Sequence, residues 1–346
     1  PGMTSRTLIS EIWTEVFEEY AQMQQKNQYF NSRALPVSVI GKFILIGKEP
    51  LVFGLMNAIH WVEAVTLCGY SVEFVVQSKY SRFLFIRNFL DKEFEDGKFP
   101  TLLINAAQRI KVVHCEFYHP YMERFFDIML GTNRNYLKVY CRDKMFGPVL
   151  RRTLKALIDQ GVTVDLDVVT PYIKQYIEGY RLNTCTFGSG AVALGKINFY
   201  MREVNLELFH EYEGANPYLE SIEKLSITKV VSPITATFLN FFHENFSNLQ
   251  KLKFTVMSKE YLVGNNVLLP LLVNTKALIQ QSSIPVLEVD IFVHSHLFNG
   301  ISLANLEVLI SQGFHINPQI GYTWQREENP GSLKSITLYP AKDTSF

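Results

Sequence analysis

One short pattern recurs in the last third of the chain and constrains the fold more than any other feature. It has apolar residues at its first, fourth and sixth positions, and copies begin at Ile222, Leu249, Ile284 and Leu333. Successive side chains of a strand point to opposite faces, so the fourth and sixth residues share one buried face. The first residue anchors the turn that leads into the strand. The pattern therefore predicts repeated strands that are each buried on one face.

Strand-like runs alternate with helical runs from about residue 70 onward. Strands are predicted at 71–76, 110–117, 137–141, 163–169, 182–187, 225–230, 249–256, 286–293 and 333–338. Helices are predicted at 83–94, 122–130, 149–160, 234–246, 267–280 and 303–311. The strand spacing is irregular but often about 25 residues, and one strand plus one helix per unit is typical of leucine-rich-type repeats. A doubly wound α/β domain shares this alternation and is the rival interpretation.

The N-terminal segment, residues 4–68, is predicted to be all-helical. Its first helix carries an apolar stripe at four-residue steps, formed by Leu8, Ile12 and Val16. A second helix is predicted to open at Leu35-Pro36, because the fixed φ of proline suits a first turn. A third is predicted from about residue 51 to 67.

These patterns together predict an α/β chain with two parts. A helical module over residues 4–68 is followed, over residues 69–340, by an irregular leucine-rich-repeat-like solenoid. The asparagine or cysteine that usually follows the strand in such repeats is absent from all four copies of the pattern, so the array is degenerate. A helical segment of this kind can also act as a cap that covers the open end of a repeat core.

The charge balance excludes several classes of function. Lys and Arg together number 33, as do Asp and Glu together, so the chain lacks the basic excess of a dedicated nucleic-acid binder.

No run reaches the roughly 18 apolar residues that span a bilayer, and we expect neither a membrane partner nor a signal peptide. The four cysteines form no C-x-x-C pair and are expected to be buried thiols of a reducing compartment. We therefore expect a cytoplasmic protein, with the nucleus as a further location.

No catalytic or cofactor motif stands out. The chain lacks G-x-G-x-x-G, G-x-S-x-G and H-E-x-x-H patterns. His294 and His296 could place two imidazoles near each other, but a polar loop after a strand is the simpler interpretation. We predict no metal, no cofactor, no catalytic residue and no enzymatic activity. An unrecognised α/β enzyme is an alternative, because catalytic groups are assembled in space.

The N-terminal residues resemble a known adaptor-binding module. The spacing T-L-x-x-x-Φ-x-x-x-Φ over residues 7–16, followed by L-P-x-x-V-x-x-x-F over residues 35–43, resembles the von Hippel–Lindau box of Cullin-2 substrate receptors. The resemblance implies that elongin C, with elongin B, is contacted by Thr7, Leu8, Ile12 and Val16. It implies that the cullin box that selects Cullin-2 consists of Leu35, Pro36, Val39 and Phe43. Ile12 stands where the family usually has a small residue.

A helical box followed by leucine-rich-type repeats resembles Zyg-type Cullin-2 receptors. The resemblance implies a substrate-recognition subunit of a RING E3 ubiquitin ligase, which brings a protein substrate to ubiquitination and degradation. It further implies substrates of the CCCH zinc-finger class. The residues that bind the substrate are not predicted.

Two alternatives to this function come from the same residues. Leu35-Pro36-x-x-Val39-Ile40 also resembles the opening of an F-box, which would make the chain a receptor of a Cullin-1 ligase. A repeat-type protein-interaction scaffold unrelated to ubiquitin is the second alternative.

Overall fold

A computed structural model of the chain divides into two compact units, residues 1–167 (unit 1) and residues 168–346 (unit 2). Within them the structure describes residues 34–36, 62–68, 71–77, 82–88, 107–141, 147–167, 174–188, 194–209, 216–230, 234–256, 265–294, 303–317 and 321–341. Both units combine helices with a mostly parallel sheet, so the predicted α/β class is confirmed.

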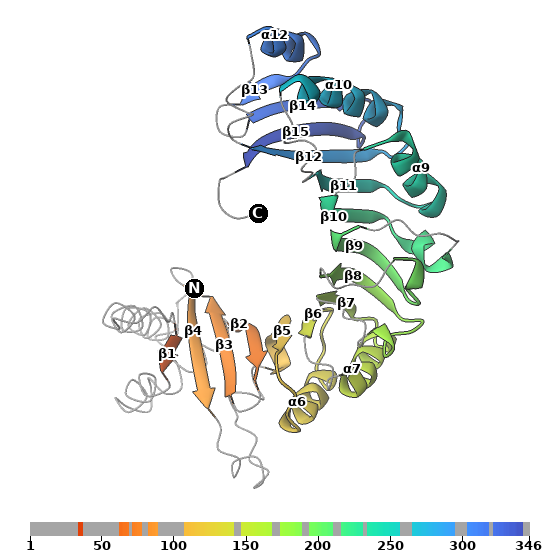
Figure 1. Cartoon of the computed structure of the whole chain (residues 1–346). Helices are drawn as coiled ribbons and strands as arrows, with labels where there is room; N and C mark the ends of the chain where they lie inside the picture. The colour runs from red at the N-terminus through yellow and green to blue at the C-terminus, as the bar shows by residue number, and fades with distance from the viewer. Residues whose placement is uncertain are drawn as a thin grey trace, which may run out of the picture. The chain divides into compact units, whose positions relative to one another are not determined.

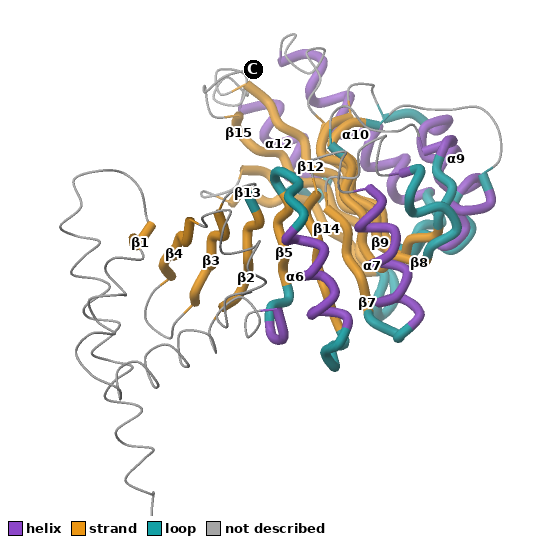
Figure 2. The backbone as a smooth tube through the Cα atoms, turned by 90° about the horizontal axis from the view of Figure 1, so that it is seen from below, coloured by secondary structure: helices purple, strands orange, loops and turns teal. Residues whose placement is uncertain are grey.

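The sheet of unit 1 contains seven strands, in the order β1-β4-β3-β2-β5-β6-β7. They are β1 (Ala34–Pro36), β2 (Val62–Leu67), β3 (Ser71–Gln77), β4 (Arg82–Asn88), β5 (Val112–Cys115), β6 (Tyr136–Cys141) and β7 (Thr163–Asp167). β2, β5, β6 and β7 are parallel neighbours, whereas β3 is antiparallel to both β2 and β4. Helices α6 (Tyr121–Leu130) and α7 (Gly147–Asp159) lie on one side of β5, β6 and β7 (Figures 1 and 2).

Unit 2 contains a run of parallel strands that are neighbours in chain order. These are β8 (Arg181–Phe187), β9 (Tyr200–Leu208), β10 (Lys224–Val230), β11 (Lys251–Val256) and β12 (Val286–His294). β15 (Leu333–Ala341) continues the run parallel to β12, and β14 (Gly321–Glu327) and β13 (His315–Asn317) close it in antiparallel pairing.

The helices of unit 2 connect these strands. They are α9 (Ala236–Asn245), α10 (Asn265–Gln281) and α12 (Leu303–Ser311), with short 3-10 turns η2 (Leu194–Lys196) and η3 (Pro217–Ser221). α9 begins where the Thr235 hydroxyl accepts a bond from the backbone N–H of Phe238 at 3.1 Å, which satisfies an otherwise unpaired donor of the first turn. α9 and α10 lie along the same face of the sheet (Figure 1).

Apolar columns run across the strands on this helix-covered face. In one column Leu225 pairs with Val204 and Leu252, and Leu252 pairs with Leu287. All four side chains are at most 1% exposed. The same spacing extends to β8 and β9 as Leu182, Cys185 and Phe187, and as Met201, Val204 and Leu206. These two copies were not predicted, because Cys185 and Met201 stand where the predicted copies have leucine or isoleucine.

The last predicted copy of the pattern, from Leu333, buries its fourth and sixth residues, Ile336 and Leu338, as predicted, but it is shifted by two residues relative to the copy on β12. Leu287 pairs with Lys334 and Val289 pairs with Ile336, so the matching copy begins at Gly331. Leu333 is 36% exposed and projects from the other face, whereas Lys334 is only 4% exposed. A pattern of apolar residues cannot find this register, because a lysine takes the place of the leucine.

Most predicted elements are confirmed, and the helix predictions that prove wrong lie in unit 1. All nine predicted strands, and five of the six helices predicted after residue 70, appear within a few residues of their predicted bounds. The helix predicted at 83–94 is wrong, because β4 occupies Arg82–Asn88. The all-helical prediction for residues 4–68 is wrong at β1 and at β2, where the β-branched residues Val62, Val65 and Thr66 favour a strand. β9, β13 and β14 were not predicted.

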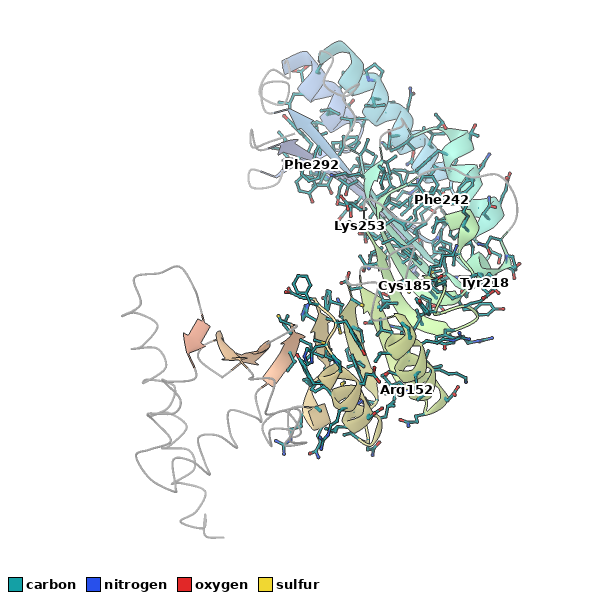
Figure 3. The ribbon with its side chains drawn as sticks, turned by 60° about the horizontal axis from the view of Figure 1, so that its bottom comes forward. Arg152, Cys185, Tyr218, Phe242, Lys253 and Phe292 are labelled. Carbon is teal, nitrogen blue, oxygen red and sulfur yellow. The ribbon has the colours of Figure 1, made fainter. Side chains whose placement is uncertain are left out.

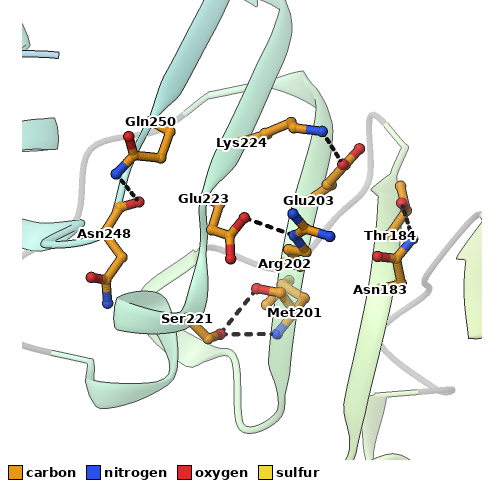
Figure 4. Close-up of polar contacts among 10 residues, drawn as sticks. All are labelled: Asn183, Thr184, Met201, Arg202, Glu203, Ser221, Glu223, Lys224, Asn248 and Gln250. Atoms are coloured by element: carbon orange, nitrogen blue, oxygen red, sulfur yellow. Dashed lines mark hydrogen bonds and ion pairs between the residues drawn. The ribbon is translucent and has the colours of Figure 1, made fainter. Parts of the chain in front are cut away.

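Side chains in the turns before the strands bond to carbonyls of the preceding turn. Asn216 Nδ2 donates to the backbone oxygens of Leu194 at 2.9 Å and Ile197 at 3.0 Å. Asn248 Nδ2 donates to the Glu220 oxygen at 2.7 Å. These bonds fasten the turns before β10 and β11 each to the preceding turn. Figure 4 shows a related contact, in which the hydroxyl of the Ser221 turn reaches back to the Met201 backbone of β9.

Unit 1 uses an arginine for the same purpose. Arg134 precedes β6 and donates to the backbone oxygens of Ala107 at 2.6 Å and Ile110 at 3.3 Å. Burial lowers the pKa of Arg134 to about 10, which still leaves the guanidinium charged at neutral pH. The turn before β6 is therefore fastened to the turn before β5 by charge-assisted bonds.

Candidate functional site

The face of unit 2 opposite the apolar columns carries charged side chains, and we call it the polar face. Its charges are sorted by strand, acidic on β9, basic on β10 and β11, and acidic on β12. They are Glu203, Glu207, Lys224, Lys229, Lys251, Lys253, Glu288 and Asp290. Figure 3 shows Lys253 on the side of the strands opposite Phe242, a buried residue of α9. Alternate residues of a strand share a face, so the strands that contribute to the apolar columns on one face carry these charged residues on the other.

Ion pairs join the basic strands to their acidic neighbours. Lys251 Nζ lies 2.6 Å from Glu288 Oε1. Lys253 Nζ lies 3.1 Å from Asp290 Oδ2 and 3.7 Å from Glu288 Oε2. Burial lowers the pKa of Lys253, but the hydrogen bond and charge of Asp290, with the charge of Glu288, outweigh burial and raise it.

A second set of pairs joins β10 to β9. Lys224 Nζ pairs with Glu203 Oε1, as Figure 4 shows, and Lys229 Nζ lies 3.8 Å from Glu207 Oε1. All these partners sit on neighbouring strands, so the pairs run across the sheet as the leucine columns do.

The lysines of the polar face are more exposed than their partners. The four lysine side chains are 39–50% exposed, whereas the four carboxylate side chains are 15–38% exposed. The ammonium groups therefore form the outer layer of the face over β10 and β11. Each ammonium has three donors, and ion pairs of this exposure contribute little to stability. The face can consequently rearrange its pairs around a ligand at small cost.

An aromatic pair adjoins the charges near the ends of β12 and β15. Phe292 and Tyr339 are register partners, and their rings stack with centroids 5.0 Å apart at 16°. Phe292 follows Glu288 and Asp290 at two-residue steps and so shares their face, and Figure 3 shows it on the same side as Lys253. Aromatic side chains of this kind commonly supply the binding energy of protein interfaces.

The corresponding face of unit 1 carries a smaller polar and aromatic cluster. His114 stacks on Tyr140 with ring centroids 4.1 Å apart, and Lys138 Nζ lies 4.7 Å from the centre of the same ring. Lys138 also pairs with Asp167 at 3.4 Å. Nearby, the Tyr136 hydroxyl donates to an Asp165 oxygen at 2.6 Å, and burial together with this bond raises the pKa of Tyr136. These side chains contact one another across neighbouring strands through ring stacking, an ion pair and a hydrogen bond.

The structure places two of the predicted adaptor-binding residues. Leu35 and Pro36 lie in β1, where they pair with Phe85 and Ile86 of β4. The prediction that Leu35-Pro36 opens a helix is therefore wrong, because Pro36 ends a strand. The remaining predicted contacts lie outside the described residues, and they are Thr7, Leu8, Ile12, Val16, Val39 and Phe43. No sequence signal had pointed to the polar face, whose charges are ordered only across strands.

The cysteines match their predicted role as buried thiols at three positions, Cys115, Cys141 and Cys185, while Cys68 is partly exposed. Burial raises the pKa of the Cys115 thiol well above its ordinary value, with a further contribution from neighbouring Cys141. Within the part of the chain that the structure describes, no group of three or more potential ligands is arranged to hold a metal ion. In that same part, no helix has the length and apolar character to cross a membrane.

Comparison with known proteins adds no family to this geometry. No family model, no curated protein and no solved structure matches the chain.

Proposed function

We propose that this chain is the substrate-recognition subunit of a Cullin-2 RING ubiquitin ligase and that it binds a protein on the polar face. The observation that carries the proposal is this face, on which eight charged side chains and an aromatic pair lie across neighbouring strands. A broad, polar and aromatic-edged surface suits a protein ligand better than a small molecule, which prefers a concave apolar pocket.

The arrangement of unit 2 favours a repeat solenoid over a doubly wound sheet. In a doubly wound sheet the strand order reverses and helices cover both faces. Here β8 to β12 are neighbours in chain order, and α9 and α10 share one face. Bonds between successive turns, such as those of Asn216 and Asn248, are expected where each repeat contacts mainly its neighbours.

The link to a ubiquitin ligase rests on the N-terminal sequence. Residues 7–16 and 35–43 resemble the elongin C and Cullin-2 contacts of a von Hippel–Lindau box. In this proposal the chain performs no bond chemistry. It holds a substrate near the ubiquitin-charged enzyme and raises its effective concentration there. The CCCH zinc-finger class is the substrate class that the resemblance suggests.

Co-purification with elongin B and elongin C tests the adaptor step. The wild-type chain is expected to form a stable complex that Leu8→Ser abolishes, because the serine removes an apolar contact from the stripe. Glu15→Ser, a polar position on the same predicted helix, is the matched control and is expected to retain the complex. If the wild-type chain binds the F-box adaptor instead, the proposed ligase would be a Cullin-1 ligase rather than a Cullin-2 ligase. A chain that binds neither adaptor would leave a scaffold unrelated to ubiquitin.

A further inference from the structure

The charge pattern of the polar face points to the kind of partner it binds. We infer that it takes a protein segment with a row of acidic side chains, flanked by basic or neutral residues, and with a large apolar side chain at one end. The inference rests on the proposed function and deepens it, since it describes the substrate segment. The four carboxylates and four lysines leave the face neutral as a whole, so the order of the charges, rather than their sum, selects the partner.

The basic band has the width of one chain segment. Neighbouring strands lie about 4.8 Å apart, so the lysines of β10 and β11 form a band roughly 10 Å wide, which is about the diameter of a helix. The acidic residues of β9 and β12 border the band on both sides. An acidic stripe on the partner would meet the lysines, and basic residues beside that stripe would meet the borders.

The outer position of the lysines favours this arrangement energetically. Lys224 and Lys229 are 47% and 50% exposed, and their carboxylate partners lie closer to the sheet. An incoming carboxylate can therefore reach an ammonium group without displacing the original partner, because each ammonium has donors to spare. Both charges of the original pair stay compensated during binding, which avoids the cost of a buried unpaired ion.

The aromatic pair defines one end of the site. Phe292 and Tyr339 stack with ring centroids 5.0 Å apart, and Phe292 follows Asp290 by two residues on the same face. A large apolar side chain placed here would cover the exposed ring surface and supply an anchor. Together the lysine band and the aromatic pair fix both the position and the direction of the bound segment.

Nucleic acid fits this surface less well. A phosphate backbone is negative on every side, so it would meet repulsion from the acidic residues of β9 and β12 as soon as it extended beyond the lysine band. The acidic borders instead reject uniformly anionic ligands and admit a segment with basic flanks.

Binding of designed peptides to the full chain, followed by fluorescence anisotropy, tests the inference. The probe is a helical peptide of roughly 20 residues, long enough to lie along the whole band, with a glutamate stripe, lysine flanks and a terminal phenylalanine. The control is a scrambled peptide of the same composition. Wild-type protein is expected to prefer the designed peptide, and Lys251→Glu/Lys253→Glu is expected to weaken its binding by about tenfold or more.

Two further arms make the test specific. Lys155→Glu/Lys196→Glu alters lysines on the helical segments α7 and η2 and should leave binding unchanged. A peptide with lysine and glutamate exchanged should bind the Lys251→Glu/Lys253→Glu variant better than the wild type, which a merely unfolded variant could not do. Equal binding of the scrambled peptide, no binding at all, or tighter binding of a single-stranded DNA of similar length through the same lysines would overturn the inference. The Lys251→Glu/Lys253→Glu variant should still co-purify with elongins, so failure of the adaptor step and failure of this site are separable.

Discussion

The middle strands of unit 2 and its last parallel strand hold different residues at the same register position. On β10, β11 and β12 the position holds Leu225, Leu252 and Leu287, which pack side by side under the helices. On β15 it holds Lys334, whose ammonium donates to the Ser282 oxygen at 2.5 Å. A leucine has a neighbour on both sides in the middle of the array, whereas the position on β15 has only one parallel neighbour.

Lys334 ends the apolar column at β15. The aliphatic stem of lysine can continue the apolar column while its charge reaches a carbonyl at the rim. Beyond Lys334 the sheet turns antiparallel, and its edge strand β13 has only three residues. A short edge presents few unpaired backbone groups and so resists unwanted pairing with other chains. The buried lysine thus stands on the last parallel strand, and the short strand β13 lies at the edge of the sheet.

The largest expected effect comes from the middle of the array. Leu252→Ala should lower the free energy of unfolding by about 3 kcal/mol, because it deletes a fully buried side chain and leaves a cavity. Leu333→Ala, the same substitution at a leucine that is 36% exposed, should cost less than about 1 kcal/mol. Urea unfolding of both variants measures the difference. Similar costs at the two leucines would contradict the register between β12 and β15.

Substitution of Lys334 on β15 should have the second-largest effect on the free energy of unfolding. Lys334→Leu restores the leucine of the column but leaves the Ser282 oxygen without its charged donor. We expect a loss of about 2 kcal/mol in the free energy of unfolding, since hydrogen bonds to charged groups contribute more than neutral ones. Lys224→Leu, at an exposed lysine of the polar face, serves as the control. A Lys334→Leu variant more stable than the wild type would show that the position behaves as an ordinary core site.

The side-chain bonds between successive turns should have an intermediate effect. Asn216 makes two bonds to the preceding turn and also accepts from the Tyr218 N–H at 3.1 Å, where it caps η3. Asn216→Ala should therefore cost about 1.5 kcal/mol. Asn248→Ala removes one bond to the preceding turn at an exposed site and should cost roughly a third as much. Thermal unfolding of the two variants gives the comparison, and an equal or reversed order would argue against the role assigned to Asn216.

The polar face should contribute least to stability. Lys251→Gln and Lys253→Gln, alone or combined, are expected to change the free energy of unfolding by less than about 1 kcal/mol, because exposed ion pairs contribute little. The same chemical denaturation, repeated at low and high salt, checks this. A large loss in the combined variant would mean that the charges of β11 and β12 hold the fold together instead of serving a ligand.

Periodicity in the sequence predicts the elements of this chain better than their register. It finds the α/β class and, in unit 2, the strands β8, β10, β11, β12 and β15, because apolar residues at strand and helix spacing depend only on local burial. It fails at β4 and β2, where apolar residues also recur at three-residue steps that fit a helix, although aromatic and β-branched residues favour a strand. It also misplaces the last repeat, because the leucine position is taken by Lys334.

The candidate site is visible only once strands are aligned. Lys251, Lys253, Glu288 and Asp290 are ordinary charges in the sequence, and the order of acidic and basic strands emerges from pairing across more than thirty residues. The sequence instead directs attention to residues 7–43, where a motif is written along one segment. A motif within one segment can be recognised from the sequence, whereas a surface formed by several strands can be recognised only from the structure.

Cross-linking of engineered cysteines tests the strand register most directly, and with it the arrangement of the polar face. In a Cys68→Ser background, Glu288→Cys/Ser335→Cys places thiols on register partners about 5 Å apart, and Glu288→Cys/Thr337→Cys places them about 8 Å apart. Copper-catalysed oxidation followed by mass spectrometry of the digest should find efficient cross-linking in the first pair and little in the second. Faster cross-linking of the second pair would mean that Leu287 pairs with Ile336, and it would contradict the account of how this array is aligned and how it ends.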